Sequence, residues 1–227
     1  MYDAIILLAG SGQRSGLSYN KVFYEVNEKP LYAYSLDVFL QDKDCKNIIF
    51  VCRAEDTDIV LDYFEEQSID KQKVEFVVGG LTRQESVLNG LKKVKAEFVF
   101  IHDGARPCIN LELIERMKKE LVYEKAVIAG IKATDTLKLI DAFGDVDKTI
   151  DREKVVQAQT PQAFNSDLII KAYEVAASEK FVATDCASVV EYVNSARIEF
   201  VEGSRWNIKV TTADDLDVIT YLLSKGE

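Results

Sequence analysis

The feature that most constrains the fold of this chain is the alternation of short apolar, β-branched runs with segments of helical periodicity. The runs predict strands at residues 4–9, 47–53, 74–78, 97–103, 126–133 and 197–202. The periodic segments predict helices at residues 30–40, 56–67, 82–94, 110–121, 166–178, 184–193 and 212–224. Such alternation is typical of a mostly parallel, twisted sheet with helices on both faces. With 227 residues, the chain is expected to form one α/β domain rather than two.

The alternation breaks at about residue 134. The stretch "TDTLKLIDAFGDVDKTIDREKVVQAQTPQAF" (134–164) has short alternating runs on either side of the turn "DAFGDVD". We expect it to form a β-arm that projects from the sheet at about residues 134–158. Because an isolated hairpin is at best marginally stable in water, the arm is expected to pack on a second subunit.

Charge and composition disfavour several classes of protein. The net charge of −10 argues against a nucleic-acid partner. No apolar run reaches about 18 residues, so no membrane span is predicted. The apolar N-terminal segment lacks the basic start and cleavage pattern of a signal peptide, which favours a cytoplasmic protein. The four cysteines lack zinc-site and C-x-x-C spacing, so reduced thiols are expected.

The loop "LLAGSGQRSGLSYNK" (7–21) follows the first predicted strand and contains three glycines with Arg14 and Lys21. Ligands of open α/β sheets bind beyond the carboxyl ends of the strands, and glycines let backbone N–H groups approach an anion closely. The spacing fits neither the P-loop nor G-x-G-x-x-G, which disfavours a nicotinamide oxidoreductase. Two cations in the loop suit charge stabilisation during transfer at phosphorus. A solvated glycine turn is the alternative.

Further polar residues follow other predicted strands, in "GGLTRQES" (79–86) and "HDGARP" (102–107), or precede the last helix, in "RWNIKVTTADDL" (205–216). Asp103 is the best candidate ligand for Mg²⁺, which takes one or two protein carboxylates beside phosphates. A turn or N-cap aspartate is the alternative. His102, the only histidine, ends an apolar strand and is expected to pack rather than to act as a base. One histidine alone supports no Ser/His/Asp or Cys/His arrangement.

Six motifs in order resemble the methylerythritol/ribitol phosphate cytidylyltransferase family over almost the whole chain. They are "LAGSGQR" with Lys21, "GGLTRQESV", "HDGARP", "TPQAF", "TDCASVVE" and "NIKVTTADDL". The resemblance implies a Rossmann-like nucleotidyltransferase fold, dependence on Mg²⁺ or another divalent cation, and a homodimer joined through the arm. It implies attack of a polyol phosphate on the α-phosphate of CTP, with release of diphosphate and no covalent enzyme intermediate.

The motifs also bear on the acceptor. "HDGARP" and "TDCASVVE" are more similar to the methylerythritol branch, so 2-C-methyl-D-erythritol 4-phosphate, an isoprenoid precursor, is the expected acceptor. Ribitol 5-phosphate, used for cell-wall polymers, is the alternative within the family. A non-catalytic nucleotide-binding module is a further alternative, but it would not need four charged residues together, namely Arg14, Lys21, Asp103 and Lys209.

The resemblance implies roles for individual residues. The nucleotide cradle would comprise Ala9, Gly10, Gly12, Gly80 and Ser86. The catalytic cations would be Arg14, Lys21 and Lys209, with Asp103 as the metal ligand. The polyol-phosphate site would comprise Arg106, Thr136, Arg152 and Thr160. Thr136 and Arg152 lie on the predicted arm and are expected to serve the neighbouring subunit.

Three positions depart from the family pattern. Asn20 replaces the proline that usually precedes the lysine, and Leu8 replaces an alanine at the end of the first strand. Cys186 replaces a residue that is usually acidic. We expect Asn20 to loosen the loop without removing the cation, and Cys186 to lack the polar role of an acidic residue.

Overall fold

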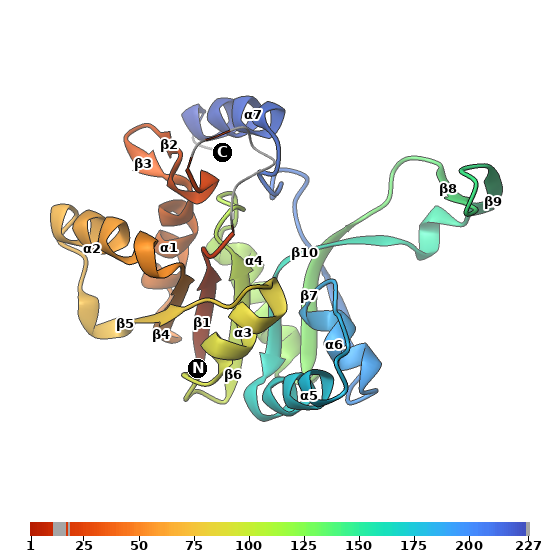
Figure 1. Ribbon diagram of the computed structural model, residues 1–227, viewed down its shortest axis with the longest axis horizontal. Coiled ribbons are helices and arrows are strands. Elements are labelled where there is room, and N and C mark those ends of the chain that lie inside the picture. Colours follow the sequence, from red (N-terminus) through yellow and green to blue (C-terminus); the bar gives the residue numbers. More distant parts are fainter. Residues whose placement is uncertain (11–16, 18, 226–227) are drawn as a thin grey trace.

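The computed structural model describes residues 1–10, 17 and 19–225. A seven-stranded sheet forms its centre, with the strand order β11-β7-β10-β6-β1-β4-β5 (Figure 1). The strands are β1 (Tyr2–Leu7), β4 (Cys45–Cys52), β5 (Val74–Val78), β6 (Phe98–Asp103), β7 (Ala126–Lys132), β10 (Val156–Asn165) and β11 (Glu199–Glu202). Only β10 among them runs antiparallel to its neighbours, so the mostly parallel sheet predicted from the sequence is confirmed.

Helices cover both faces of the sheet because both sets of alternating strand side chains are apolar. In β1, Ala4 and Ile6 face one buried cluster, to which α1 (Leu31–Gln41), α2 (Thr57–Glu66) and α4 (Leu111–Leu121) contribute. Ile5 faces the other, with α3 (Arg83–Leu91), α5 (Ser166–Ser178) and α6 (Cys186–Tyr192). Strands buried on both faces are near-continuous apolar runs, which explains the pattern that predicted them.

A third apolar cluster lies above the carboxyl ends of the parallel strands. There α7 (Ala213–Ser224) packs through Leu216 and Ile219 on Val26 and Leu31. Val26 belongs to a small hairpin of β2 (Glu25–Val26) and β3 (Lys29–Pro30), and both elements lie beside α7 in Figure 1. No described helix has the length and apolar character needed to cross a membrane.

The central strand β10 was not predicted, and its residues were assigned instead to the arm and the segment after it. Gln162–Asn165 pair with β6, and Val156–Ala158 and Gln162–Phe164 pair with β7. The strand contains polar residues and Pro161, which argue against a central strand. Its register shifts between Ala158 and Gln162, around a cis Thr160–Pro161 bond, and this shift accommodates the proline.

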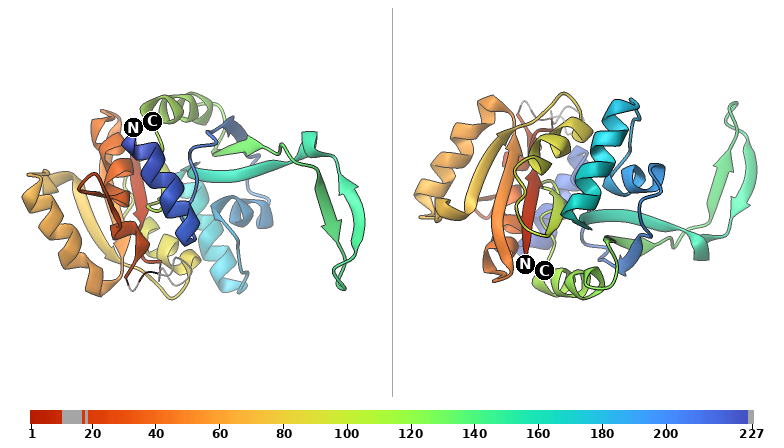
Figure 2. Two further views of the ribbon diagram at one scale, coloured as in Figure 1. Left: turned by 90° about the horizontal axis from the view of Figure 1, so that it is seen from above. Right: turned by 90° about the horizontal axis from the view of Figure 1, so that it is seen from below.

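The arm is a hairpin of β8 (Leu137–Ile140) and β9 (Val146–Ile150), followed by the short helix η5 (Arg152–Lys154). It extends away from the sheet in every view (Figures 1 and 2). Residues 156–158 belong to β10, so the arm ends before the expected residue 158. Its tip exposes apolar side chains, including Ile140, Val146 and Phe143, the last 92% exposed.

Candidate active site

Asp103 ends β6 and is the centre of a charged cluster at the carboxyl edge of the sheet. Its Oδ2 lies 2.8 Å from Nζ of Lys209, and its Oδ1 lies 3.1 Å from a terminal nitrogen of Arg83. Arg83 is the first residue of α3, and Lys209 lies in the segment before α7. Burial alone would raise the pKa of Asp103, but the charges of Arg83 and Lys209 outweigh burial and hold the pKa below its usual range. The carboxylate is therefore ionised and paired.

Lys21 lies at the same edge and is only 9% exposed. It is the first residue of the short helix η2 (Lys21–Phe23). Burial raises the pKa of Asp215, in the first turn of α7, but backbone hydrogen bonds and the charge of Lys21 lower it overall. Lys21 is therefore close enough to the start of α7 to act on a carboxylate there.

Asn20 fixes the chain at Lys21. Its amide nitrogen donates to the carbonyl of Leu8 at 2.5 Å and to Oδ2 of Asp56 at 3.3 Å, and its Oδ1 accepts from the backbone N–H of Val22. Arg53 holds Asp56 through two hydrogen bonds of 2.7 and 2.8 Å. Asn20 thus connects the residue after β1 and the short helix after β4 to the start of η2, while most of the loop expected to loosen lies outside the described residues.

The loops after β1 and β5 meet at the predicted nucleotide cradle. A Cβ atom at Gly79 would lie 2.6 Å from Cβ of Ala9, so only glycine permits this approach. The backbone N–H of Gly80 donates to Oγ of Ser86 at 3.1 Å. The structure thus brings Ala9, Gly80 and Ser86 together, and a Cβ at Gly10 would meet open space.

The start of α3 closes one side of this cradle. Oγ1 of Thr82 accepts from the backbone N–H of Glu85 at 3.1 Å, while the carboxylate of Glu85 accepts from the N–H of Leu81 at 2.7 Å. The Glu85 carboxylate thus pairs with a backbone donor of the loop that precedes α3.

Two predicted acceptor-site residues, Thr160 and Arg106, lie beside Asp103. Oγ1 of Thr160 accepts from the backbone N–H of Asp103 at 3.1 Å. A terminal nitrogen of Arg106 donates to the carbonyl of Asn207 at 2.7 Å, and the Asn207 amide donates to the carbonyl of Thr160 at 2.8 Å. These contacts place both residues next to the charged cluster.

The other two predicted acceptor-site residues do not join this cluster within one chain. Thr136 and Arg152 are exposed on the arm, which extends away from the end of β6 (Figure 1). Arg152 donates instead to the carbonyl of Thr134 at 2.7 Å, at the base of the arm. Gly12 and Arg14 lie outside the described residues.

Sequence reasoning gave no role to Arg83 and Asn207, although both lie in motifs that carry the resemblance. Arg83 also contacts Cys186, whose Sγ lies 3.5 Å from its guanidinium and 3.2 Å from the hydroxyl of Tyr173. Burial raises the pKa of the Cys186 thiol, which is therefore neutral at neutral pH. Cys186 supplies a weak polar contact where an anion is usual.

The carboxylates at this edge of the sheet suit only one kind of divalent-cation site. Among residues 1–10, 17 and 19–225, no three His, Cys, Asp or Glu side chains are arranged to hold a metal ion. Mg²⁺ needs no such group when substrate phosphates and water complete its coordination, and Asp103 is a carboxylate at the right edge of the sheet. A metal that binds through phosphates therefore fits, whereas the side chains of the described residues form no metal site by themselves.

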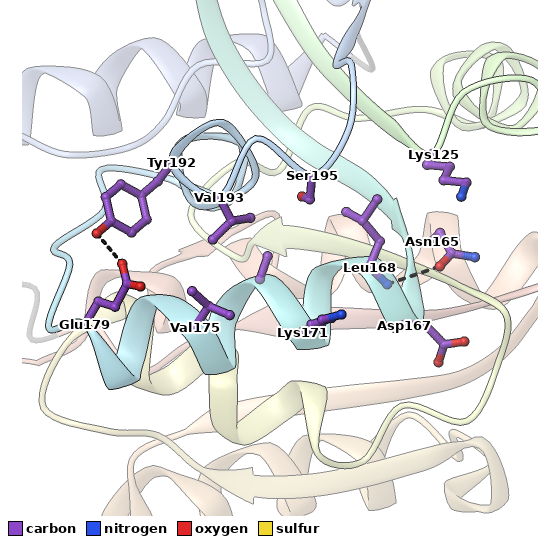
Figure 3. A pocket seen from close by; sticks show the side chains of 11 residues that line it. Lys125, Asn165, Asp167, Leu168, Lys171, Val175, Glu179, Tyr192, Val193 and Ser195 are labelled. Atoms are coloured by element: carbon purple, nitrogen blue, oxygen red, sulfur yellow. Dashed lines mark hydrogen bonds between the residues drawn. The ribbon is translucent and has the colours of Figure 1, made fainter.

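A separate pocket of about 830 Å³ lies between α5 and the segment that follows α6 (Figure 3). Lys125, Lys171 and Asp167 line it, and Tyr192 donates to Glu179 at its rim. None of its lining residues belongs to the charged cluster around Asp103.

Comparison with known proteins decides the family. The family described as 2-C-methyl-D-erythritol 4-phosphate cytidylyltransferase matches residues 2–225. The chain belongs to this family. The cytidylyltransferase of Clostridioides difficile is 36% identical over 99% of this chain and 94% of its own length. That of Shouchella clausii is 39% identical over 100% of this chain and 98% of its own length.

The cytidylyltransferase fold is also shown by a solved structure. The 4-diphosphocytidyl-2C-methyl-D-erythritol synthase of Anaerococcus prevotii superposes with a TM-score of 0.87 at 34% identity. The match covers 98% of this chain and 97% of that one. The predicted Rossmann-like nucleotidyltransferase fold is therefore confirmed.

Proposed function

We propose that this chain transfers the cytidylyl group of CTP to 2-C-methyl-D-erythritol 4-phosphate and releases diphosphate, as a divalent-cation-dependent cytoplasmic enzyme. The observation that supports the proposal best is the ion pair of Lys209 with Asp103 at the carboxyl edge of the sheet, where Ala9, Gly79 and Ser86 also come together and where Lys21 follows the end of β1. A member of this family that kept only nucleotide binding would not need a buried lysine and a paired carboxylate there.

The reaction needs charge stabilisation more than proton transfer. The attacking group is a phosphate oxygen of the acceptor, which is largely deprotonated at neutral pH because its second pKa is about 6. No general base is required, in agreement with a buried His102 whose pKa burial lowers to about 4. Lys21 and Lys209 would neutralise the charge that builds on the oxygens around the α-phosphorus, and diphosphate would leave without a covalent intermediate.

A divalent cation would add to this charge stabilisation when CTP is bound. Asp103 would hold it together with phosphate oxygens. Arg83 and Lys209 already pair with Asp103, and they keep this carboxylate ionised and oriented at the edge of the sheet.

The proposal includes a homodimer in which the arm reaches the neighbouring acceptor site. Thr136 and Arg152 are exposed on the arm, whereas Arg106 and Thr160 are fixed at the edge of the sheet. The apolar tip, with Ile140, Phe143 and Val146, has the composition of a surface that a partner covers. Two copies would thus combine all four predicted acceptor-site residues.

The proposal is tested by measuring the release of diphosphate from CTP in the presence of Mg²⁺. The measurement is made separately with 2-C-methyl-D-erythritol 4-phosphate and with ribitol 5-phosphate as the acceptor. The proposal requires a strong preference for the first acceptor. A preference for ribitol 5-phosphate would keep the chemistry and replace the acceptor. No release with either acceptor would contradict the proposed function.

A further inference from the structure

A closed ring of hydrogen bonds joins four residues behind Asp103. Nδ1 of His102 lies 3.0 Å from Oγ1 of Thr160, and Nε2 of His102 lies 3.0 Å from the carbonyl oxygen of Arg106. The Arg106 guanidinium donates to the carbonyl of Asn207, whose amide donates back to the carbonyl of Thr160. His102 and Asn207 are fully buried, and Thr160 is 4% exposed, so water does not compete for these bonds.

The chemistry of the partners fixes the direction of each bond. The carbonyl of Arg106 can only accept, so Nε2 of His102 must carry a proton. The ring is fully buried and its two nitrogens face a carbonyl and a hydroxyl, neither of which is a carboxylate that could pair with a second ring proton, so Nδ1 offers a lone pair. The hydroxyl of Thr160 must therefore donate its proton to Nδ1, while its oxygen accepts from the backbone N–H of Asp103.

We propose that His102 is a positioning residue that takes the hydroxyl proton of Thr160, so that Thr160 orients Asp103 and has no proton to donate to a substrate phosphate. The use of this arrangement in acceptor binding rests on the proposed function. Among the acceptor-site residues fixed at the edge of the sheet, Arg106 then remains as a hydrogen-bond donor, and its Nε is buried without a hydrogen-bond partner among the described residues. Thr160 then takes part in acceptor binding through its hold on Asp103 and not through its own hydroxyl proton.

The ring also accounts for the polar residue at position 160 of β10. The carbonyl of Thr160 accepts from the Asn207 amide and its hydroxyl lies 3.0 Å from Nδ1 of His102, at the point where the register of β10 shifts. An apolar residue at position 160 would leave the backbone N–H of Asp103 and Nδ1 of His102 without a partner, and an unpaired buried polar group is costly.

NMR of the only imidazole tests the proposal directly. Because the chain has one histidine, tag-free protein labelled with ¹⁵N-histidine gives one Nδ1 and one Nε2 resonance. At neutral pH and without substrate we expect the proton on Nε2 and none on Nδ1. The Nδ1 resonance should move in Thr160→Val and stay near its original position in Thr160→Ser. The Nε2 resonance, held by the Arg106 carbonyl, serves as the control for an intact fold.

Three NMR results would overturn the proposal. They are a proton on Nδ1, protons on both nitrogens at neutral pH, and an unchanged Nδ1 resonance in folded Thr160→Val. Because no substrate is present, these results do not depend on the proposed function. A chain that shows the expected tautomer but transfers no cytidylyl group would refute the function and leave the hydrogen-bond assignment standing.

A matched pair of variants tests the link to acceptor binding. An asparagine places its amide near the position of Nδ1 and can still accept from Thr160, whereas a glutamine places its amide near Nε2 and cannot. We expect His102→Gln to raise the acceptor KM about tenfold more than His102→Asn, as for the loss of one hydrogen bond. The KM for CTP should change by less than about twofold in either variant. Equal effects of the two variants, or equal effects on both substrates, would contradict a positioning role.

Discussion

The ammonium of Lys209 lies 2.8 Å from Oδ2 of Asp103, while Arg83 pairs with the other oxygen of the same carboxylate. The candidate metal ligand is thus neutralised by two cations before any substrate binds. A free divalent cation would have to displace or share these partners. A nucleotide that brings its own metal, and attracts Lys209 to its phosphates, would relieve that competition.

Metal affinity should therefore depend on the nucleotide. We expect Mn²⁺, used as a paramagnetic substitute for Mg²⁺, to bind at least about tenfold more tightly with an unreactive CTP analogue than without it. Electron paramagnetic resonance of free Mn²⁺ measures this, after correction for the metal that the analogue binds alone. Asp103→Asn should reduce the increase in Mn²⁺ affinity that the CTP analogue causes. Equal affinity with and without nucleotide would show that the protein holds the metal by itself.

Removal of the Lys21 charge should slow the chemical step. We expect Lys21→Ala to lower kcat by about 10²–10³-fold, as for the loss of one preorganised charge-stabilising group. Circular dichroism should show an intact fold. Lys119→Ala, at an exposed position on α4, is the control for the loss of a lysine elsewhere. Near-normal turnover in Lys21→Ala would remove this residue from the mechanism.

Asn20 should affect kcat because it fixes the backbone directly before Lys21. Its φ of −68° is one that proline adopts, so Asn20→Pro can replace hydrogen bonding by a fixed backbone. We expect Asn20→Ala to lower kcat about tenfold, as for one lost buried hydrogen bond, and Asn20→Pro to lower it less. Steady-state kinetics of both variants decide this. A proline variant slower than the alanine variant would show that the hydrogen bonds themselves are required.

The arm should act on the acceptor site of the other subunit. We expect Arg152→Ala to raise the KM for the acceptor about tenfold or more and to leave the KM for CTP nearly unchanged, because a charged hydrogen bond to a phosphate is lost. Mixing Lys21→Ala chains with Arg152→Ala chains should restore part of the activity, since one hybrid site would contain both native residues. Absence of recovery after verified subunit exchange would argue against shared sites.

The free energy of unfolding should decrease as the pH is lowered, because His102 takes up a proton more readily in the unfolded chain. Burial lowers the pKa of His102 to about 4, whereas an unfolded histidine titrates near 6.5. Between these values the unfolded chain binds more protons, so stability is lost as the pH falls from about 6.5 towards 4. The expected contribution is about 2 kcal/mol between pH 7 and pH 5. Urea unfolding at both pH values measures it, and His102→Asn should lose this part of the pH dependence; an unchanged dependence would contradict the assignment.

The sequence predicted most of the fold because both sets of strand side chains are buried and apolar. The strand at 74–78 and the helix at 166–178 match β5 and α5, and β1 lies two residues before its predicted position of 4–9. It did not reveal β10, because Gln159, Thr160 and Gln162 are polar and their burial depends on partners from distant segments. Local pattern carries no information about those partners.

The sequence predicted which residues of the candidate site follow the strand ends, but not how they contact one another. Asp103 and Lys209 could be named, but their direct contact depends on how the segment before α7 folds back over β6. The structural role of Asn207 had one signal, its place in the same motif as Lys209. Its bond to the carbonyl of Thr160 follows from the register of β10, which the sequence did not show.

The central claim is direct cytidylyl transfer to the acceptor phosphate. The most direct test follows CTP labelled at the α-phosphorus in the presence of Mg²⁺ and 2-C-methyl-D-erythritol 4-phosphate. Our account predicts that the label moves into a cytidine diphospho-polyol with one diphosphate released per product, and that no label stays on the protein. Diphosphate released without labelled polyol product, or label bound covalently to the chain, would contradict it.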